Sequence, residues 1–290
     1  MKIAFLGTPE AATPPLRALV NAGYEVEVVI TRPDRRRGRG SDLVASPVKK
    51  VAQELGLRVE HSLKALDEIN VEIGIVVAYG AMIPATLLER IPMLNVHFSL
   101  LPRWRGAAPV ERAILAGDVE TGVGIMSLEP TLDTGPLHCE KRTLIGEKSA
   151  ANLTAELAEL GAAALLEVLA SPDLLANATP QQGEPTYAEK LTKETFRLLP
   201  SMNVELFRRT VRLGGAYCMI GAKRLRVDET ASAVTEVPAG QIIGDRTGAY
   251  LGLPDGSVRL VRVQPEGAKP MASEAWWAGT RANENGLHWD

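Results

Sequence analysis

Short, mostly apolar runs alternate with helical patterns through the first half of the chain. Runs of this length and composition are typical of strands that are buried on both faces of a sheet. The predicted strands cover residues 2–6, 25–31, 73–78 and 94–98, and the predicted helices include residues 16–22 and 47–55. Because strands that are separated by helices pair in parallel with right-handed crossovers, a doubly wound, mostly parallel α/β sheet is expected.

The pattern changes in the second half. A long helix is predicted from an N-cap at Ser149 to about residue 170, followed by a Pro/Gln/Gly stretch at residues 179–185 that is typical of a linker or a crossing loop. After residue 200, one helix at 204–213 precedes short β-like runs at 225–227, 241–243, 249–253 and 258–263. This spacing favours a small, OB-like barrel. We therefore predict a first domain over 1–185, a linker over 186–203 and a second domain over 204–290.

Composition and charge narrow the class of protein. The 290 residues are 46% hydrophobic and carry a net charge of −3, which excludes a generally basic nucleic-acid coat. No apolar run reaches the roughly 18 residues that span a membrane, and the N-terminus lacks the pattern of a signal peptide. The two cysteines lie far apart, so a disulfide framework and a zinc site are not expected. A cytoplasmic protein is the default expectation.

Asn95, His97 and Asp133 combine an amide, an imidazole and a carboxylate. Asn95 and His97 are two residues apart in a predicted strand, so their side chains point to one face, near the edge where parallel sheets bind ligands. An amide can donate to an oxyanion, and an imidazole can carry a proton. Asp133, in a Gly-flanked loop, could supply a carboxylate that favours the imidazolium. The trio predicts group transfer at a carbonyl carbon.

Each of these residues also has an ordinary structural explanation. Asn95 could cap a turn, His97 could be a buried core histidine, and Asp133 could belong to a plain loop. Competing signatures are missing, however, because the sequence has no GxGxxG, GxxxxGK[ST] or GxSxG motif. Its four histidines show no metal-ligand spacing, so no metal site is expected.

A basic segment follows the second predicted strand. Its sequence is Arg32-Pro33-Asp34-Arg35-Arg36-Arg37-Gly38-Arg39-Gly40, and residues 31–50 hold seven Lys and Arg against two acids. A charge run of this kind is often only a solvated loop. It is also suited to contact phosphates, since arginines neutralise a nucleic-acid backbone and glycines let the loop bend around it.

Taken together, these motifs resemble the family of methionyl-tRNA formyltransferases. The similarity is dense up to about residue 191 and sparser afterwards. The residues that carry it are Phe5-Leu6-Gly7-Thr8-Pro9-Glu10, Arg32-Pro33-Asp34-Arg35, Val77-Ala78-Tyr79-Gly80, Asn95-Val96-His97, Ser99-Leu100-Leu101-Pro102-Arg103-Trp104-Arg105-Gly106, Leu132-Asp133-Thr134-Gly135, Thr186-Tyr187-Ala188-Glu189-Lys190-Leu191 and Gln264-Pro265-Glu266-Gly267.

The resemblance implies a Rossmann-like domain, an OB-like domain and a reaction. The reaction transfers the formyl group of 10-formyltetrahydrofolate to the α-amino group of methionyl initiator tRNA, without a metal. Catalytic roles fall on Asn95, His97 and Asp133. The implied folate contacts are Ser99, Leu100, Leu101, Pro102, Tyr79 and Gly80, and the implied tRNA contacts are Arg35, Arg36, Arg37 and Arg39. A monomer is expected.

The sequence departs from the family pattern in three places. Residues 213–217 replace a turn that is usually similar to Asn-Pro-Trp-Pro-Gly, the connection between residues 61 and 73 is short, and Phe98 stands where many members have glycine. Two other functions stay open from the residues alone. One is formylation of an amino sugar or another small amine, and the other is RNA binding without catalysis.

Overall fold

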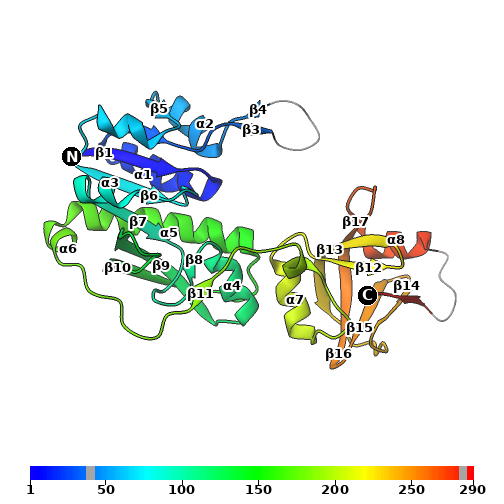
Figure 1. The fold of residues 1–290 in the computed structure, drawn as a ribbon. Helices are drawn as coiled ribbons and strands as arrows, with labels where there is room; N and C mark the ends of the chain where they lie inside the picture. Colours follow the sequence, from blue (N-terminus) through cyan, green and yellow to red (C-terminus); the bar gives the residue numbers. More distant parts are fainter. Residues whose placement is uncertain (37–42, 281–285) are drawn as a thin grey trace. The chain divides into compact units, whose positions relative to one another are not determined.

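Two compact units make up the computed structural model, which describes residues 1–36, 43–280 and 286–290 (Figure 1). The N-terminal unit contains Met1–Val110, Val119–Ile145 and Leu153–Glu189. The C-terminal unit contains Glu111–Asp118, Gly146–Asn152 and Lys190–Asp290.

A seven-stranded sheet forms the centre of the N-terminal unit, in the order β10-β9-β7-β6-β1-β2-β5. The strands are β1 (Lys2–Gly7), β2 (Glu25–Ile30), β5 (Val59–Glu60), β6 (Ile73–Val77), β7 (Met93–His97), β9 (Glu120–Ser127) and β10 (Leu137–Leu144). β5, β2, β1, β6 and β7 pair in parallel, whereas β9 and β10 are antiparallel. The predicted doubly wound, mostly parallel sheet is confirmed, with an antiparallel edge that was not predicted.

The predicted strands became buried strands because their side chains have apolar neighbours on both faces. All residues of β6 and β7 are buried. Burial on both faces accounts for the continuous apolar sequence of β6, whereas β7 interrupts its apolar residues with Asn95 and His97. β10 is different, since most of its side chains are partly exposed at the edge of the sheet. Its sequence, Leu-His-Cys-Glu-Lys-Arg-Thr-Leu, therefore lacks the apolar run by which the other strands were recognised.

Helices cover this sheet. They are α1 (Thr13–Asn21), α2 (Pro47–Glu54), α3 (Ala85–Arg90), α5 (Ala150–Ala170) and α6 (Pro172–Ala176), with 3₁₀ turns η1 (Glu10–Ala12) and η2 (Leu63–Asp67). α1 begins before its two prolines rather than after them, because first-turn residues need no backbone N–H. α5 runs along the sheet (Figure 1), and a Cβ added at Gly161 would lie 2.7 Å from Val96 of β7. Glycine therefore allows the close approach of α5 to β7.

The C-terminal unit is an antiparallel barrel. Its strands are β12 (Tyr217–Ile220), β13 (Lys223–Ser232), β14 (Gln241–Asp245), β15 (Gly248–Leu253), β16 (Gly256–Pro265), β17 (Met271–Ala272) and β18 (Leu287–His288). They pair in the order β12-β13-β16-β15-β14-β18, with β17 on β16. Met219 and Asp290 exchange two backbone hydrogen bonds, of 2.6 and 2.9 Å, and so join β12 to the chain end after β18. The predicted small barrel is confirmed.

The core of the barrel lies between its strands and α7 (Val204–Arg212). Phe207 of α7 is fully buried and meets the Trp289 ring edge to face at 5.9 Å. Asn203 caps α7 by accepting a 2.7 Å hydrogen bond from the Leu206 N–H. The unit also holds α4 (Pro109–Ala116, which begins in the N-terminal unit), η3 (Glu194–Phe196) and α8 (Ser273–Gly279).

Two sequence features of the barrel have a local explanation. The Asp255-Gly256 signal lies at a hairpin, as expected, but the two turn residues are Pro254 and Asp255, and Gly256 begins β16 opposite Leu253. In the departing turn between α7 and β12, Gly214 and Gly215 both have positive φ, of 81° and 83°. Positive φ favours glycine, so the two glycines explain how residues 213–217 form this turn without the usual family sequence.

Candidate active site

Asn95 and His97 lie at the end of β7, one of the central strands of the N-terminal sheet. Their side chains are almost completely buried, with exposures of 8% and 6%. They are two residues apart on one strand, so both point to the same face, as the sequence predicted. β7 pairs with β6 on one side and with β9 on the other, and this pairing holds the two side chains on a rigid element.

The Asn95 side-chain amide is available for a ligand. Within the residues that the structure describes, the amide makes no hydrogen bond to another protein group. A buried amide usually has such a partner. Because its two N–H groups are strong donors, the amide is suited to bind an oxygen atom that gains negative charge.

A backbone carbonyl holds the His97 ring in place. The Nε2 atom lies 3.0 Å from the carbonyl oxygen of Trp104, and a carbonyl only accepts, so Nε2 carries a hydrogen. Nδ1 faces Asp133, with 3.8 Å between Nδ1 and Oδ2. That separation is too long for a hydrogen bond but short enough for an ion pair with a protonated ring. The Trp104 carbonyl thus sets the tautomer of the neutral His97 ring.

A hydrogen bond to its carboxylate and an unusual backbone conformation define the position of Asp133. Its Oδ2 atom accepts a 2.8 Å hydrogen bond from the Gly106 N–H, and its φ of 50° lies in the left-handed region that Asp tolerates better than most residues. Gly106 has a φ of 123°, and an added Cβ would lie 2.7 Å from the Ala188 carbonyl oxygen. Only glycine fits where the loop offers its N–H to Asp133.

The segment between His97 and Gly106 is a tight turn whose side chains mostly point inward. Ser99 is fully buried, and its hydroxyl donates to the Arg103 carbonyl at 2.6 Å. Leu101 and Pro102 are buried and Leu100 is partly exposed. The predicted folate contacts Ser99, Leu100, Leu101 and Pro102 therefore follow directly on β7, and Leu100 has the most accessible side chain of the four.

β8 (Arg105–Gly106) continues this turn and pairs in parallel with β11 (Tyr187–Ala188). The Trp104 N–H donates to the Thr186 hydroxyl at 2.9 Å, and the Arg105 N–H donates to the Thr186 carbonyl at 2.9 Å. These bonds hold the carbonyl that orients His97. The sequence analysis placed residues 186–188 in the linker, because a strand as short as β11 shows no hydrophobic pattern.

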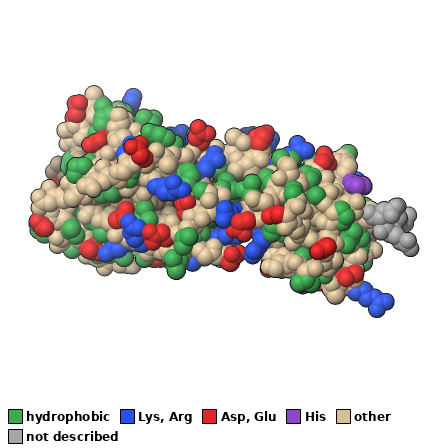
Figure 2. All heavy atoms as spheres, turned by 90° about the horizontal axis from the view of Figure 1, so that it is seen from below, with side chains coloured by type: hydrophobic (Ala, Val, Ile, Leu, Met, Phe, Trp, Pro, Cys, Tyr) green, Lys and Arg blue, Asp and Glu red, His purple; other side chains and the backbone are tan. Residues whose placement is uncertain are grey.

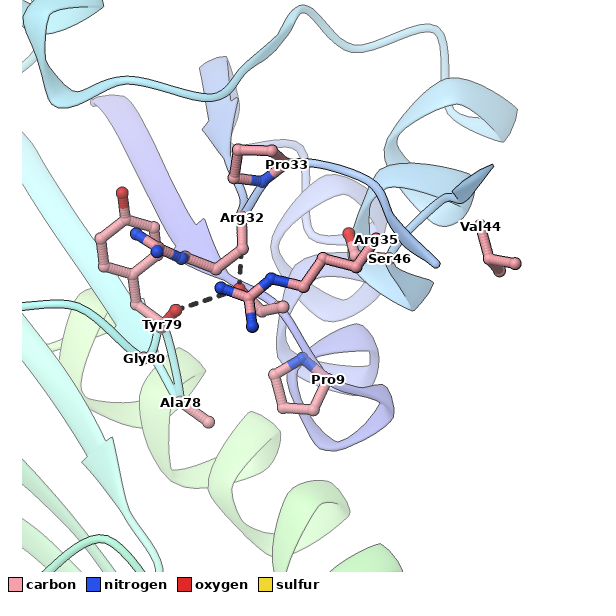
Figure 3. A pocket seen from close by; sticks show the side chains of 10 residues that line it. Pro9, Arg32, Pro33, Arg35, Val44, Ser46, Ala78, Tyr79 and Gly80 are labelled. Atoms are coloured by element: carbon pink, nitrogen blue, oxygen red, sulfur yellow. Dashed lines mark hydrogen bonds between the residues drawn. The ribbon is translucent and has the colours of Figure 1, made fainter. Parts of the chain in front are cut away.

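A cavity of about 260 Å³ opens at the carboxyl ends of β1, β2 and β6 (Figure 3). The chain passes from β1 outward to β2 and β5 and then returns to β6, so this is the switch point where open α/β sheets bind ligands. The lining residues are Thr8, Pro9, Arg32, Pro33, Arg35, Val44, Ser46, Ala78, Tyr79 and Gly80. The cavity thus joins predicted folate contacts to a predicted tRNA contact, and none of the trio lines it.

Hydrogen bonds order the wall of the cavity. The Thr8 hydroxyl donates to the Tyr79 carbonyl at 3.0 Å and accepts from the Arg32 N–H at 3.4 Å (Figure 3). Burial raises the pKa of the Tyr79 phenol, an effect that the nearby Arg32 guanidinium partly offsets. The phenol is therefore a neutral donor near pH 7. Arg32 and Thr8 were not predicted as site residues, although both stand in motifs that the sequence displayed.

Arg35 and Arg36 form the short strand β3, which pairs with β4 (Leu43–Val44). Both are exposed, and neither meets an acidic partner among the residues described here. The other two predicted tRNA contacts, Arg37 and Arg39, lie outside the described residues. Asp34 and Lys49 form an ion pair of 2.7 Å at the base of the segment, so Lys49 is already neutralised.

Surface charges elsewhere on the N-terminal unit are mixed. Figure 2 shows basic and acidic side chains interspersed on one face. Exposed ion pairs include Lys141 with Glu167 and Arg142 with Glu120. Over residues 1–36, 43–280 and 286–290, no three His, Cys, Asp or Glu side chains gather as metal ligands. In that same part of the chain, no helix has the length and apolar character needed to cross a membrane.

Comparisons with known proteins identify the family to which the chain is similar. The formyl transferase family model covers residues 1–169, and the model of the formyl transferase C-terminal domain covers residues 192–281. A methionyl-tRNA formyltransferase from Paracoccus denitrificans (strain Pd 1222) is 40% identical over 286 residues, which are 93% of this chain and 95% of that protein. One from Neisseria meningitidis serogroup C (strain 053442) is 39% identical over 301 residues, covering 96% of this chain and 97% of that one.

Solved structures share the fold at low sequence identity. A methionyl-tRNA formyltransferase from Clostridium thermocellum superposes with a TM-score of 0.56 at 15% identity, covering 80% of this chain and 94% of that one. An N-formyltransferase from Helicobacter canadensis, solved with folinic acid and dTDP-3-aminofucose, gives a TM-score of 0.67 at 14% identity, covering 93% and 100%. These two likenesses concern the fold alone.

Proposed function

The chain belongs to the formyltransferase family, and from this premise we propose that it transfers the formyl group of 10-formyltetrahydrofolate to the α-amino group of methionyl initiator tRNA. The main support for the proposal is that the chain is about 40% identical to methionyl-tRNA formyltransferases over more than nine tenths of its length. The geometry of Asn95, His97 and Asp133 supports it, because it meets the chemical needs of this transfer.

The reaction begins when the neutral amine attacks the formyl carbon and a new C–N bond forms. The former carbonyl oxygen becomes an oxyanion. The Asn95 amide, which has no protein partner among the described residues, donates a hydrogen bond to that oxygen. The His97 Nε2–H is directed to the Trp104 carbonyl, so a protonated His97 contributes mainly its positive charge. Donors placed in advance at a developing oxyanion are usually a large part of catalysis.

Asp133 accepts the proton that the attacking amine loses, directly or through a water molecule. Its carboxylate also stabilises the protonated His97 ring across the 3.8 Å that separates Oδ2 from Nδ1. The intermediate then collapses, the bond from the formyl carbon to the folate nitrogen breaks, and that nitrogen takes up the proton. Tetrahydrofolate and the N-formylated acceptor leave without any oxidation or reduction.

We assign the folate to the Ser99–Pro102 turn, with Tyr79 and Gly80 as further contacts. The turn is suited to this role because it follows the catalytic strand and keeps its backbone in a fixed shape. Arg35 and Arg36 receive the tRNA backbone, since both are exposed cations without an acidic partner in the described part of the chain. Arg37 and Arg39 are assigned to the same contact from the family resemblance. We further propose that the protein acts in the cytoplasm as a monomer.

One assay tests the proposal. Purified protein is given 10-formyltetrahydrofolate together with methionyl initiator tRNA, methionyl elongator tRNA, a nucleotide-linked amino sugar, or no acceptor, and formyl transfer is followed. Transfer that is at least about 100-fold faster to initiator tRNA than to the sugar is expected. Transfer to the sugar alone contradicts the proposed acceptor, and RNA binding without any transfer contradicts catalysis.

A further inference from the structure

Gln181 makes four hydrogen bonds beside the proposed active site. Its Oε1 atom accepts from Nε and NH2 of Arg105, at 3.1 and 2.7 Å. Its Nε2 atom donates to the Asp133 carbonyl at 2.9 Å and to the Gly135 carbonyl at 2.8 Å. One carboxamide therefore connects β8 with both sides of the loop that presents Asp133.

The chemistry of the partners requires an amide at this position. A guanidinium only donates and a backbone carbonyl only accepts, so the oxygen of Gln181 must face Arg105 and the nitrogen must face the loop. A glutamate could keep the Arg105 contact, but it would point a negative oxygen at two carbonyls. A glutamine is the side chain of this length that satisfies all four bonds.

Neighbouring contacts hold the segment that carries Gln181 in place. Thr179 exchanges two 2.8 Å backbone hydrogen bonds with Leu137, immediately after the Asp133 loop. On the other side, the Ala107 N–H donates to the Ala188 carbonyl at 2.8 Å. Gln181 thus lies on a segment tied at both ends to elements that flank the proposed active site.

Gln181 binds the backbone of Asp133, the residue that accepts the proton in the proposed reaction. Asp133 has a left-handed φ of 50°, and its carboxylate must stay in place between the Gly106 N–H and His97. We propose that Gln181 is a positioning residue, which holds the Asp133 loop so that the carboxylate faces His97 during formyl transfer. This inference rests on the proposed function, in which Asp133 takes part in the reaction.

The test compares three variants of the full-length protein. Gln181→Glu removes both donors to the loop and keeps the contact to Arg105. Gln181→Asn keeps the amide but is one methylene shorter, so it cannot reach both Arg105 and the Asp133 loop. It replaces the glutamate variant in the test if that variant does not fold. Gln182→Glu is the matched control, because Gln182 is the exposed neighbour. We expect kcat to fall about 10- to 100-fold for the Gln181 variants, since small misplacements have effects of this size, and less than twofold for the control.

A double-mutant cycle separates positioning from general stability. If Gln181 acts through Asp133, then adding Gln181→Glu to an Asp133→Asn chain lowers kcat by less than about twofold, because the group being positioned is already lost. A merely structural role gives the same loss in both backgrounds. A full-size loss of kcat in the Asp133→Asn background, or wild-type kcat in both Gln181 variants, overturns the inference.

Amide hydrogen exchange gives a readout that does not depend on the acceptor. We expect Gln181→Glu to speed exchange of the Gly106 amide, whose N–H is bonded to Asp133, while amides of strand β15 in the other unit stay as in the wild type. Unchanged exchange at Gly106 overturns the inference even if tRNA is formylated. Conversely, faster exchange in a protein that does not formylate tRNA supports the positioning contact and contradicts the proposed function.

Discussion

Replacing Asp133 with asparagine removes one negative charge from the site and leaves its shape nearly unchanged. The asparagine oxygen can still accept the hydrogen bond that the Gly106 N–H donates to Oδ2 at 2.8 Å. The fold should therefore be retained, and we expect the thermal unfolding midpoint to shift by no more than about 3 °C. Any large loss of activity then reports on charge rather than on folding.

The structure gives the size of the lost interaction. With 3.8 Å between Oδ2 of Asp133 and Nδ1 of His97, a carboxylate and an imidazolium attract by about 4 kcal/mol at an effective dielectric constant of about 20. The two side chains are 12% and 6% exposed, so water screens only part of this attraction. Because each 1.4 kcal/mol or so of barrier changes the rate about tenfold, kcat should fall by about 10²- to 10³-fold.

Single-turnover formylation of methionyl initiator tRNA, with saturating 10-formyltetrahydrofolate, measures this loss directly. Glu184→Gln is the matched control, since it removes one carboxylate from an exposed position of the same unit. Its rate should stay within twofold of the wild type. A rate for Asp133→Asn within about tenfold of the wild type, in a chain that unfolds normally, would refute the electrostatic role of Asp133.

Three further changes follow from the geometry. Asn95→Ala removes the proposed oxyanion donor, so kcat should fall at least about 10²-fold with little change in the unfolding midpoint, as checked by kinetics and thermal melts. Arg36→Ala, at an exposed position outside the cavity lining, should raise the KM for tRNA and reduce its salt dependence by about one phosphate contact while leaving the KM for folate unchanged, as measured between 50 and 200 mM salt. Gly135→Ala places a Cβ in steric conflict with the Ser127 carbonyl oxygen, so a lower unfolding midpoint is expected. A midpoint equal to that of the wild type would contradict that packing.

The parallel strands of the N-terminal unit could be predicted because buried strands consist mostly of apolar residues that follow one another in the sequence. β1 and β6 have apolar side chains on both faces, and those residues are adjacent in the sequence. β10 escaped prediction for the converse reason, since an edge strand with partly exposed side chains needs no apolar run.

The candidate site divides in the same way. Asn95 and His97 could be paired from the sequence, because two residues apart on one strand means one face. Their distance from Asp133 could not, since the loop that carries Asp133 is placed by contacts to Gly106 and Gln181 that lie far away in the chain. The Trp104 carbonyl that orients His97 left no sequence signal at all, because every residue has a carbonyl.

The mostly parallel sheet, the barrel, the reactive groups and the family resemblance could all be inferred from the amino-acid sequence. These depend on hydrophobic period and residue type, which are local properties. The folded chain alone shows that a backbone carbonyl orients His97, that Asp133 stands at ion-pair distance, and that the Pro/Gln/Gly stretch at 179–185 brings Gln181 to the Asp133 loop. Such contacts are long-range hydrogen bonds between groups that many residues possess, and only the folded chain selects which of them meet.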